Sequence, residues 1–179
     1  ADCAKDRNFS SLHIKKDQLE KFADDFTKVY NKAWAGHGGL KELDRKVVIK
    51  MFESMKPVMD EKISWFAYYK DEPIAIWINL PDLNQWFKHL HGKFGLLNKL
   101  KFLWIKKTKK CDKFVGLVFG IVPEWQGKGV DSYMIVEGAK IIQKLKIENG
   151  VYTLGSNPIY SDYEMQWIGE FNPKMINVA

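Results

Sequence analysis

The sequence predicts one globular domain of the α/β class, in the broad sense that includes α+β folds, and three observations predict it. The chain has 179 residues, of which 46% are apolar and 14% aromatic. That is enough for one sizeable core and excludes a disordered chain. Several segments place apolar residues at helical spacing, and others are rich in branched and aromatic residues as strands are. Helical and strand patterns follow one another along residues 1–179, without a linker between domains.

Two helical patterns open the chain, after a short edge strand expected within residues 7–14. The first runs from Asp17, which we expect as its N-cap with Glu20 as capping-box partner, to Trp34. The second runs from Lys41 to Met55 and is ended by Pro57. Its apolar positions predict a buried side made of Leu43, Val47, Ile49, Met51 and Phe52.

The middle of the chain predicts a hairpin, a helix and a buried strand. Residues 63–69 and 74–80 are rich in aromatic and branched residues, and the polar turn 70–73 joins them into an antiparallel hairpin. An amphipathic helical pattern covers 83–104 and is broken near 92–95. Residues 114–122 are apolar or glycine without a charge, which predicts a strand buried on both faces.

A glycine loop follows this strand: Pro123-Glu124-Trp125, then Gln126-Gly127-Lys128-Gly129. A long helix is expected from near Lys128 to a C-cap at Asn149-Gly150, packed on the strand 114–122. A helix N-terminus presents unpaired N–H groups and a positive dipole end, and glycines let a phosphate approach the backbone. The loop is not a P-loop, and Ser132 stands where a dinucleotide loop has its third glycine. The pattern fits either a pyrophosphate site or a tight strand-to-helix connection.

The end of the chain predicts one more strand. A polar, turn-rich segment covers residues 152–162 and precedes a strand expected at 163–171. Residues 172–174 then form a turn.

Positive charge is concentrated in one segment. The formal net charge is +6, and residues Lys99 to Lys113 contain seven lysines against Asp112 alone. Such a segment attracts a phosphate, a nucleic acid or an anionic membrane, or is a solvated loop that keeps the protein in solution. Phe102 and Trp104 are its only aromatic residues, which is few for stacking on nucleic-acid bases.

Other features narrow the class of protein. No apolar stretch reaches the length of a transmembrane segment, and no signal peptide is apparent. Two cysteines, Cys3 and Cys111, indicate free thiols in a reducing cytoplasm rather than a disulfide framework. His89 and His91 lack an acid or cysteine at ligand spacing, so we expect no metal site.

The run from Gly120 to Val130 resembles the acyl-CoA site of the GNAT superfamily of N-acyltransferases: a buried strand, a proline, and Gln/Arg-x-x-Gly-x-Gly/Ala opening a long helix. Gln126 and Gly129 match, whereas Asp131 replaces the last small residue and puts a carboxylate near the pyrophosphate. A bacterial GNAT-like subgroup is similar in this loop, in Tyr30-Asn31-x-Ala33-Trp34 and in Leu80-Pro81-Asp82-x-Asn84. The resemblance covers Phe9 to Met175. It implies a mixed, mostly antiparallel sheet with helices on both faces.

The resemblance also implies a cosubstrate, acetyl-CoA or another acyl-CoA, and residues that hold it. The backbone of Gly120, Ile121 and Val122 would pair with the pantetheine arm. Asn172, at the end of the last strand, would face the CoA, and Lys128 would add a cation. The pyrophosphate would be held by backbone N–H groups of Gln126, Gly127, Lys128, Gly129, Val130 and Asp131.

Amine acylation needs an oxyanion donor, a base and a proton for the leaving thiolate. The N–H of Ile121 or Val122 is the expected donor. Glu170 is the expected base, with Glu164 the other candidate, because the strand before the loop has no acid. The family's thiol-protonating tyrosine lies in a helix that this chain lacks, which suggests a truncated chain or a departure from the family. The candidates that remain are Tyr133, Tyr160 and Tyr163.

The sequence is therefore compatible with three functions. The first is an N-acyltransferase acting on a small-molecule or peptide amine, and the second is a GNAT-fold module that binds a ligand or partner without catalysis. The third is a protein that binds an anionic partner through residues 99–113.

Overall fold

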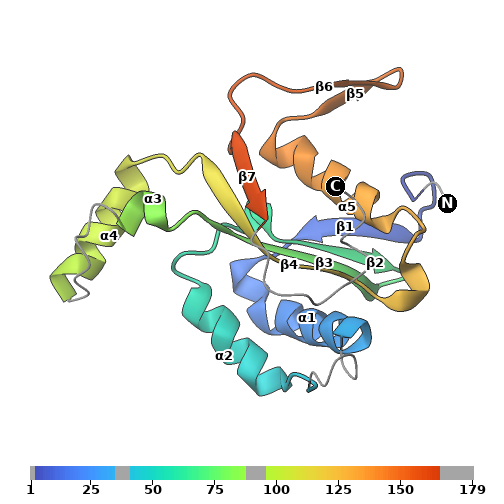
Figure 1. The fold of residues 1–179 in the computed structure, drawn as a ribbon, viewed down its shortest axis with the longest axis horizontal. Helices are drawn as coiled ribbons and strands as arrows, with labels where there is room; N and C mark the ends of the chain where they lie inside the picture. The colour runs from blue at the N-terminus through green and yellow to red at the C-terminus, as the bar shows by residue number, and fades with distance from the viewer. Residues whose placement is uncertain (1–2, 35–40, 88–95, 166–179) are drawn as a thin grey trace.

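The computed structural model describes residues 3–34, 41–87 and 96–165 (Figure 1). A five-stranded sheet in the order β1-β2-β3-β4-β7 organises it. Its strands are β1 (Phe9–His13), β2 (Trp65–Tyr69), β3 (Glu72–Pro81), β4 (Lys113–Ile121) and β7 (Asp162–Met165). Neighbours from β1 to β4 are antiparallel, and β7 is parallel to β4. The expected mixed, mostly antiparallel sheet is confirmed.

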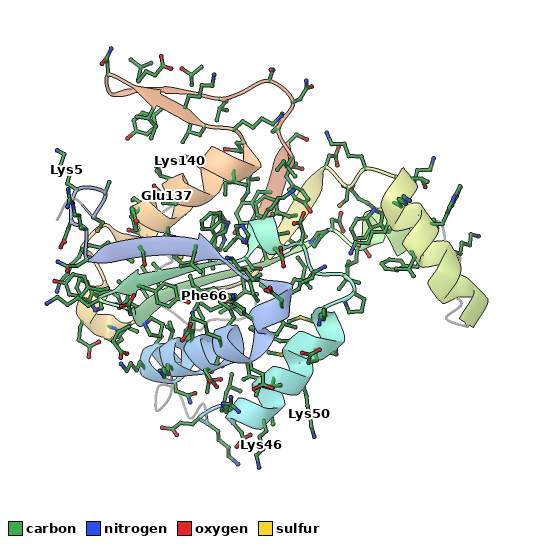
Figure 2. The ribbon with its side chains drawn as sticks, turned by 180° about the vertical axis from the view of Figure 1, so that it is seen from behind. Lys5, Lys46, Lys50, Phe66, Glu137 and Lys140 are labelled. Atoms are coloured by element: carbon green, nitrogen blue, oxygen red, sulfur yellow. The ribbon has the colours of Figure 1, made fainter. Side chains whose placement is uncertain are left out.

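Helices cover both faces of this sheet. On one face lie α1 (Leu19–Trp34), preceded by the 3-10 turn η1 (Lys16–Gln18), and α2 (Arg45–Met55) (Figure 1). The ring of Phe22 on α1 lies 5.0 Å from that of Phe66 on β2, which Figure 2 labels at the sheet. Because Asp17 lies inside η1, it is not the N-cap of α1, contrary to the expectation.

The opposite face is covered by α5 (Val130–Ile142), which lies against β1, β2 and the 3-10 turn η2 (Glu61–Ile63). The expected packing on residues 114–122 is only part of its surroundings: Phe114, Phe119 and Ile121 share a core cluster with Val130 and Met134, but the helix lies mainly over β1 and β2. Trp65 and Trp77 fill this face, and Gly138 gives them room, since a Cβ there would lie 3.0 Å from the Trp77 ring. Because α5 lies over β1 and β2, β4 is only half-buried along much of its length, and not buried on both faces as expected.

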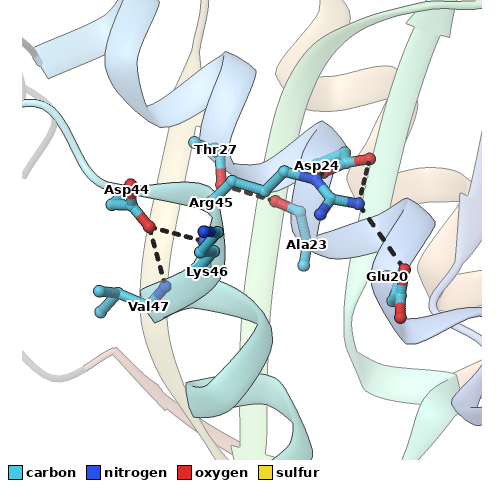
Figure 3. Close-up of polar contacts among 8 residues, drawn as sticks. All are labelled: Glu20, Ala23, Asp24, Thr27, Asp44, Arg45, Lys46 and Val47. Atoms are coloured by element: carbon cyan, nitrogen blue, oxygen red, sulfur yellow. Dashed lines mark hydrogen bonds and ion pairs between the residues drawn. The ribbon is translucent and has the colours of Figure 1, made fainter.

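The second helix begins later than expected and buries a different face. Its N-cap is Asp44, whose carboxylate accepts hydrogen bonds from the N–H groups of Lys46 and Val47 (Figure 3). The next residue, Arg45, pairs with Asp24 and Glu20 of α1 and ties the two helices together (Figure 3). This helix start and orientation turn Val48 and Phe52 inward, whereas Val47 is 58% exposed and Met51 39% exposed.

Two hairpin turns use residues in the left-handed region. The predicted β2–β3 hairpin is confirmed, and its turn residues Lys70 and Asp71 have φ of 48° and 66°. Asn149-Gly150 is also a hairpin turn, between β5 (Lys146–Glu148) and β6 (Val151–Thr153), rather than a helix C-cap. The expected end of the long helix is therefore wrong, because α5 stops at Ile142.

The remaining helices lie before and within the basic segment. They are α3 (Asn84–Phe87) and α4 (Leu96–Thr108), which projects from the sheet (Figure 1). α4 extends past the expected end at Trp104 into the lysine-rich residues. No helix among the described residues is both long and apolar enough to cross a bilayer.

Candidate functional site

The glycine loop lies between the end of β4 and the start of α5, outside any regular strand or helix, as expected. After the 3-10 turn η3 (Pro123–Trp125), residues 126–129 form a turn. Gly127 and Gly129 have φ of 70° and 81°, a region that favours glycine. Gly129 is the N-cap of α5, and no side chain caps this helix end.

The loop offers backbone N–H groups to an anion. The first intrahelical bond of α5 joins the Tyr133 N–H to the Gly129 carbonyl at 3.0 Å, so the N–H groups of residues 130–132 precede it. The loop is exposed from Gln126 to Gly129, and a Cβ on Gly127 would meet nothing within 4 Å. Asp131 is exposed in the first turn, and the buried Val130 side chain holds the helix start in the core.

Aromatic packing fixes the loop in place, which the sequence reasoning missed. The Trp125 ring lies 4.6 Å from that of Tyr69 and 5.4 Å from that of Phe9. The Lys128 Nζ lies 5.0 Å above the Trp125 ring, and the Cys3 Sγ donates to the Lys128 carbonyl at 3.6 Å. A Trp among polar and glycine residues was the available sequence signal for this anchor.

The end of β4 has one edge bound to β3 and one edge turned away from it. The Val122 N–H donates to the Ile74 carbonyl at 2.9 Å, so Val122 faces β3. Because backbone groups alternate in an antiparallel pair, the N–H and C=O of Ile121 point to the opposite edge. The Gln126 side-chain amide donates to that Ile121 carbonyl at 3.1 Å. Of the two expected oxyanion donors, Ile121 is therefore the one whose N–H is turned away from β3.

Gly120 holds a tryptophan against the same strand. A Cβ on Gly120 would lie 2.2 Å from the Trp34 ring, so only glycine lets this ring approach β4 so closely. Trp34 ends α1 and lies 4.9 Å from the Tyr30 ring. These aromatic residues belong to the predicted 30–34 segment and line the α1 side of the strand that leads into the loop.

The other candidate side chains are spread over the molecule. Glu164 on β7 forms an ion pair with Lys113. Tyr133 lies in the first turns of α5, and burial raises its pKa. Tyr163 on β7 accepts from the Trp77 Nε1 at 3.3 Å, and burial raises its pKa too. Tyr160 lies beside Phe114, near the start of β4 and away from the loop.

Several predicted residues lie outside the described residues, namely Glu170, Asn172, His89 and His91. Their roles stay predictions. Within residues 3–34, 41–87 and 96–165, no group of three His, Cys, Asp or Glu side chains is placed to hold a metal ion.

Comparison with known structures identifies the fold. No protein-family model matches the chain. A possible acetyltransferase from Clostridium difficile 630 superposes with a TM-score of 0.52 at 12% sequence identity, over 94% of this chain and 85% of that one. The chain has the GNAT fold. Two further structures match at a TM-score of 0.42: the loading GNATL domain of CurA from Lyngbya majuscula and the GNAT-like decarboxylase GphF in complex with isobutyryl-CoA. They are 14% and 9% identical and are covered over 61% and 62% of their lengths, against 80% and 79% of this chain.

The chain is also similar in sequence to a curated protein. The bacterial ceramide synthase of Caulobacter vibrioides (strain NA1000 / CB15N) is 23% identical over 157 residues, which is 86% of this chain. The chain spans only 38% of the length of that relative.

Proposed function

We propose that the chain is an acyl-CoA-dependent N-acyltransferase that moves an acyl group from CoA to an amine. The observation on which this rests most is the helix N-terminus of α5, which has a left-handed glycine as N-cap and no side chain over its first N–H groups. The loop joins it to a strand whose last residue turns its backbone away from β3. In a GNAT fold, this is where a pyrophosphate and a pantetheine arm would bind.

The loop fits a CoA pyrophosphate by its chemistry. Residues 126–131 would donate backbone N–H groups, and the positive end of the α5 dipole would add to them. Lys128 would supply a cation from its position over Trp125, where no acid neutralises it among the described residues. Gly127 is exposed, and the open space where its Cβ would lie leaves room for phosphate oxygens. The backbone of Gly120, Ile121 and Val122 would contact the pantetheine arm.

The chemistry requires this chain to bind the thioester, orient it and move protons. The thioester supplies the acyl group and a thiol leaving group. The Ile121 N–H would donate to the developing oxyanion, because it is the donor turned away from β3. We retain Glu170 as the base and Asn172 as a CoA contact. Tyr133 and Tyr163 stay candidates for protonating the thiolate, whereas Tyr160 lies near the other end of β4.

The acceptor is proposed as a small amine rather than a peptide. A ceramide is the N-acyl derivative of a long-chain amine, so the named activity of the relative is amide formation on a lipid amine. We take an amphiphilic amine as the first acceptor to test. A reducing cytoplasm is the proposed compartment, because Cys3 and Cys111 are buried and neither is in a disulfide.

The test is calorimetric titration with CoA, acetyl-CoA and a long-chain acyl-CoA, together with thermal unfolding. At a ligand concentration about 100 times the Kd, bound CoA should raise the free energy of unfolding by roughly 2.7 kcal/mol. Gly129→Glu should abolish binding, because its side chain and charge would occupy the phosphate position. Gly150→Glu is the matched control: Gly150 also has a positive φ, 79°, in open space, but lies in the β5–β6 turn.

The outcomes separate the two GNAT hypotheses. If no CoA species binds or stabilises the protein, the acyltransferase proposal is wrong. If CoA binds, Gly150→Glu keeps binding, and long-chain amines are acylated, the proposal holds. Binding without release of CoA thiol for any amine tested would instead support a ligand-binding module.

A further inference from the structure

A cavity of about 740 Å³ lies at the end of β4 that is farthest from the glycine loop. Its wall is built from separated parts of the chain: η1, the segment around η2, the end of β3, α3, the end of α4 with the residues after it, and the approach to β7. Its apolar lining residues include Met59, Pro81, Trp86 and Ile159. Six lysines also line it, namely Lys16, Lys62, Lys106, Lys107, Lys109 and Lys110.

The two acids of the cavity have other partners. Asp60 accepts from the Tyr160 hydroxyl at 2.8 Å and from the Lys62 N–H at 3.1 Å. Glu61 accepts from the Lys16 backbone N–H at 2.6 Å. No carboxylate in the described part of the chain forms an ion pair with any of the six lysines. Asp60 lies close enough to Lys106 to favour its charge, and the Lys106 Nζ also donates to the Pro57 carbonyl at 2.6 Å. Among the described residues, six lysines still face two acids, so the cavity rim is positive.

Apolar side chains adjoin this positive rim on α4. Phe102 and Ile105 are buried, with the Phe102 ring 5.9 Å from that of Trp86. Leu103 and Trp104 face away and are 55% and 63% exposed. Residues three and four positions apart are neighbours on a helix, so Lys107 lies beside both exposed apolar side chains. Lys107 thus joins the lysine-lined cavity to an exposed apolar patch.

We propose that α4 and the lysine-lined cavity form a docking surface for an anionic lipid bilayer. Lysines beside a Trp and a Leu match the two parts of such a surface, because the cations meet lipid phosphates while the apolar side chains enter the headgroup boundary. α4 projects from the sheet, so a flat partner can reach it (Figure 1). A nucleic acid is disfavoured, because Trp104 is the one exposed aromatic residue on this helix within its described side chains.

The experiment is co-sedimentation of the full chain with two kinds of vesicle, phosphatidylcholine alone and phosphatidylcholine with phosphatidylglycerol. The protein should bind only the anionic vesicles. Lys107→Glu/Lys110→Glu should weaken binding at least about tenfold, since each lysine near an anionic surface contributes about fivefold. Leu103→Ser/Trp104→Ser should also weaken it about tenfold through lost apolar burial. Both pairs are exposed, so the fold should be kept.

Matched controls lie on α2. Figure 2 labels Lys46 and Lys50 there, and Lys46→Glu/Lys50→Glu makes the same change of charge on another surface. Val47→Ser, at a residue 58% exposed, controls for loss of an exposed apolar side chain. These controls should bind like the original protein.

Four results would overturn the proposal. The first is equal binding to neutral and anionic vesicles, and the second is a loss of vesicle binding in the α2 controls equal to that in the α4 variants. The third is displacement from vesicles by inorganic phosphate, which would indicate a site for small anions. The fourth is tighter binding of a single-stranded oligonucleotide through the same lysines. The proposal does not depend on CoA binding, which the Gly129→Glu variant tests separately.

Discussion

Single residues near the site show two different reasons for a glycine. Gly129 is required by its backbone, since φ of 81° at a helix N-cap strains other residues. Gly120 is required by its surroundings, because a Cβ there would overlap the Trp34 ring. The loop motif predicts the first. The second was invisible in the sequence, because it depends on α1 crossing β4 at this point.

Asp131→Ala provides a prediction at this scale. The carboxylate lies in the first turn of α5, where it favours the dipole, so its loss should lower the free energy of unfolding by about 0.3–1 kcal/mol. The same charge would repel a bound pyrophosphate, so CoA affinity should rise a few-fold. Denaturant unfolding and calorimetric titration measure the two effects. Asp131→Asn should reproduce both effects, because the charge of the side chain and not its size causes them. Unchanged CoA affinity in Asp131→Ala would mean that this carboxylate points away from the phosphates.

At the scale of elements, the sequence predicted the types and order of the central strands and main helices but not all their ends. α5 ends where Lys144 takes a left-handed φ of 52°, a position at which sequence rules look for Gly or Asn. The Asn149-Gly150 pair was predicted as that stop. Helix C-caps and two-residue hairpin turns both need positive φ, so one dipeptide suits either.

Packing partners were harder to predict than element types. The apolar spacing within residues 41–55 predicted a helix, yet Val48 rather than Val47 is buried, because Asp44 and Arg45 fix where the helix begins and how it meets α1. The motif located the glycine loop correctly, whereas its anchor Trp125 and the choice between Ile121 and Val122 depend on strand pairing. Such facts come from the arrangement of segments distant in sequence.

The N-cap of α2 supports a prediction at the element scale. Asp44→Ala should lower the free energy of unfolding by about 1 kcal/mol, because the N–H groups of Lys46 and Val47 lose their acceptor. Asp44→Ser keeps a capping oxygen and should retain most of the stability. Denaturant unfolding monitored by circular dichroism measures both variants. An equal loss in the two would show that the negative charge of Asp44, rather than its cap, stabilises this helix.

For the whole molecule, the glycine loop and the lysine-lined cavity occupy opposite ends of β4. The strand runs from Lys113 to Ile121, so its ends are about 26 Å apart at 3.3 Å per residue. A bilayer bound at the cavity would therefore leave the loop accessible to a CoA from solution. Because the two surfaces do not overlap, the two proposals are compatible in one chain.

Two tyrosines are buried in the molecule, one in each half of the core. Tyr68 donates to Asp25 at 2.7 Å on the α1 side, and Tyr160 donates to Asp60 at 2.8 Å beside the cavity. Each side chain is 4% exposed. Burial, together with the neighbouring carboxylate, raises the pKa of both hydroxyls well above the ordinary value of 10.0.

We therefore expect the protein to lose stability as pH rises above about 10. There the unfolded chain releases its tyrosine protons while the folded chain keeps them, so each tyrosine should lower the free energy of unfolding by about 1.4 kcal/mol per pH unit. Denaturant unfolding over a series of alkaline pH values measures this slope.

Tyr68→Phe and Tyr160→Phe should each lower stability at neutral pH, because a carboxylate loses its donor, yet each should remove its share of the alkaline slope. Tyr152→Phe, at a residue 64% exposed, is the control and should leave the slope unchanged. A slope that persists in the double variant would assign the alkaline loss to Tyr133, Tyr163 and Cys111, whose pKa values are also raised by burial.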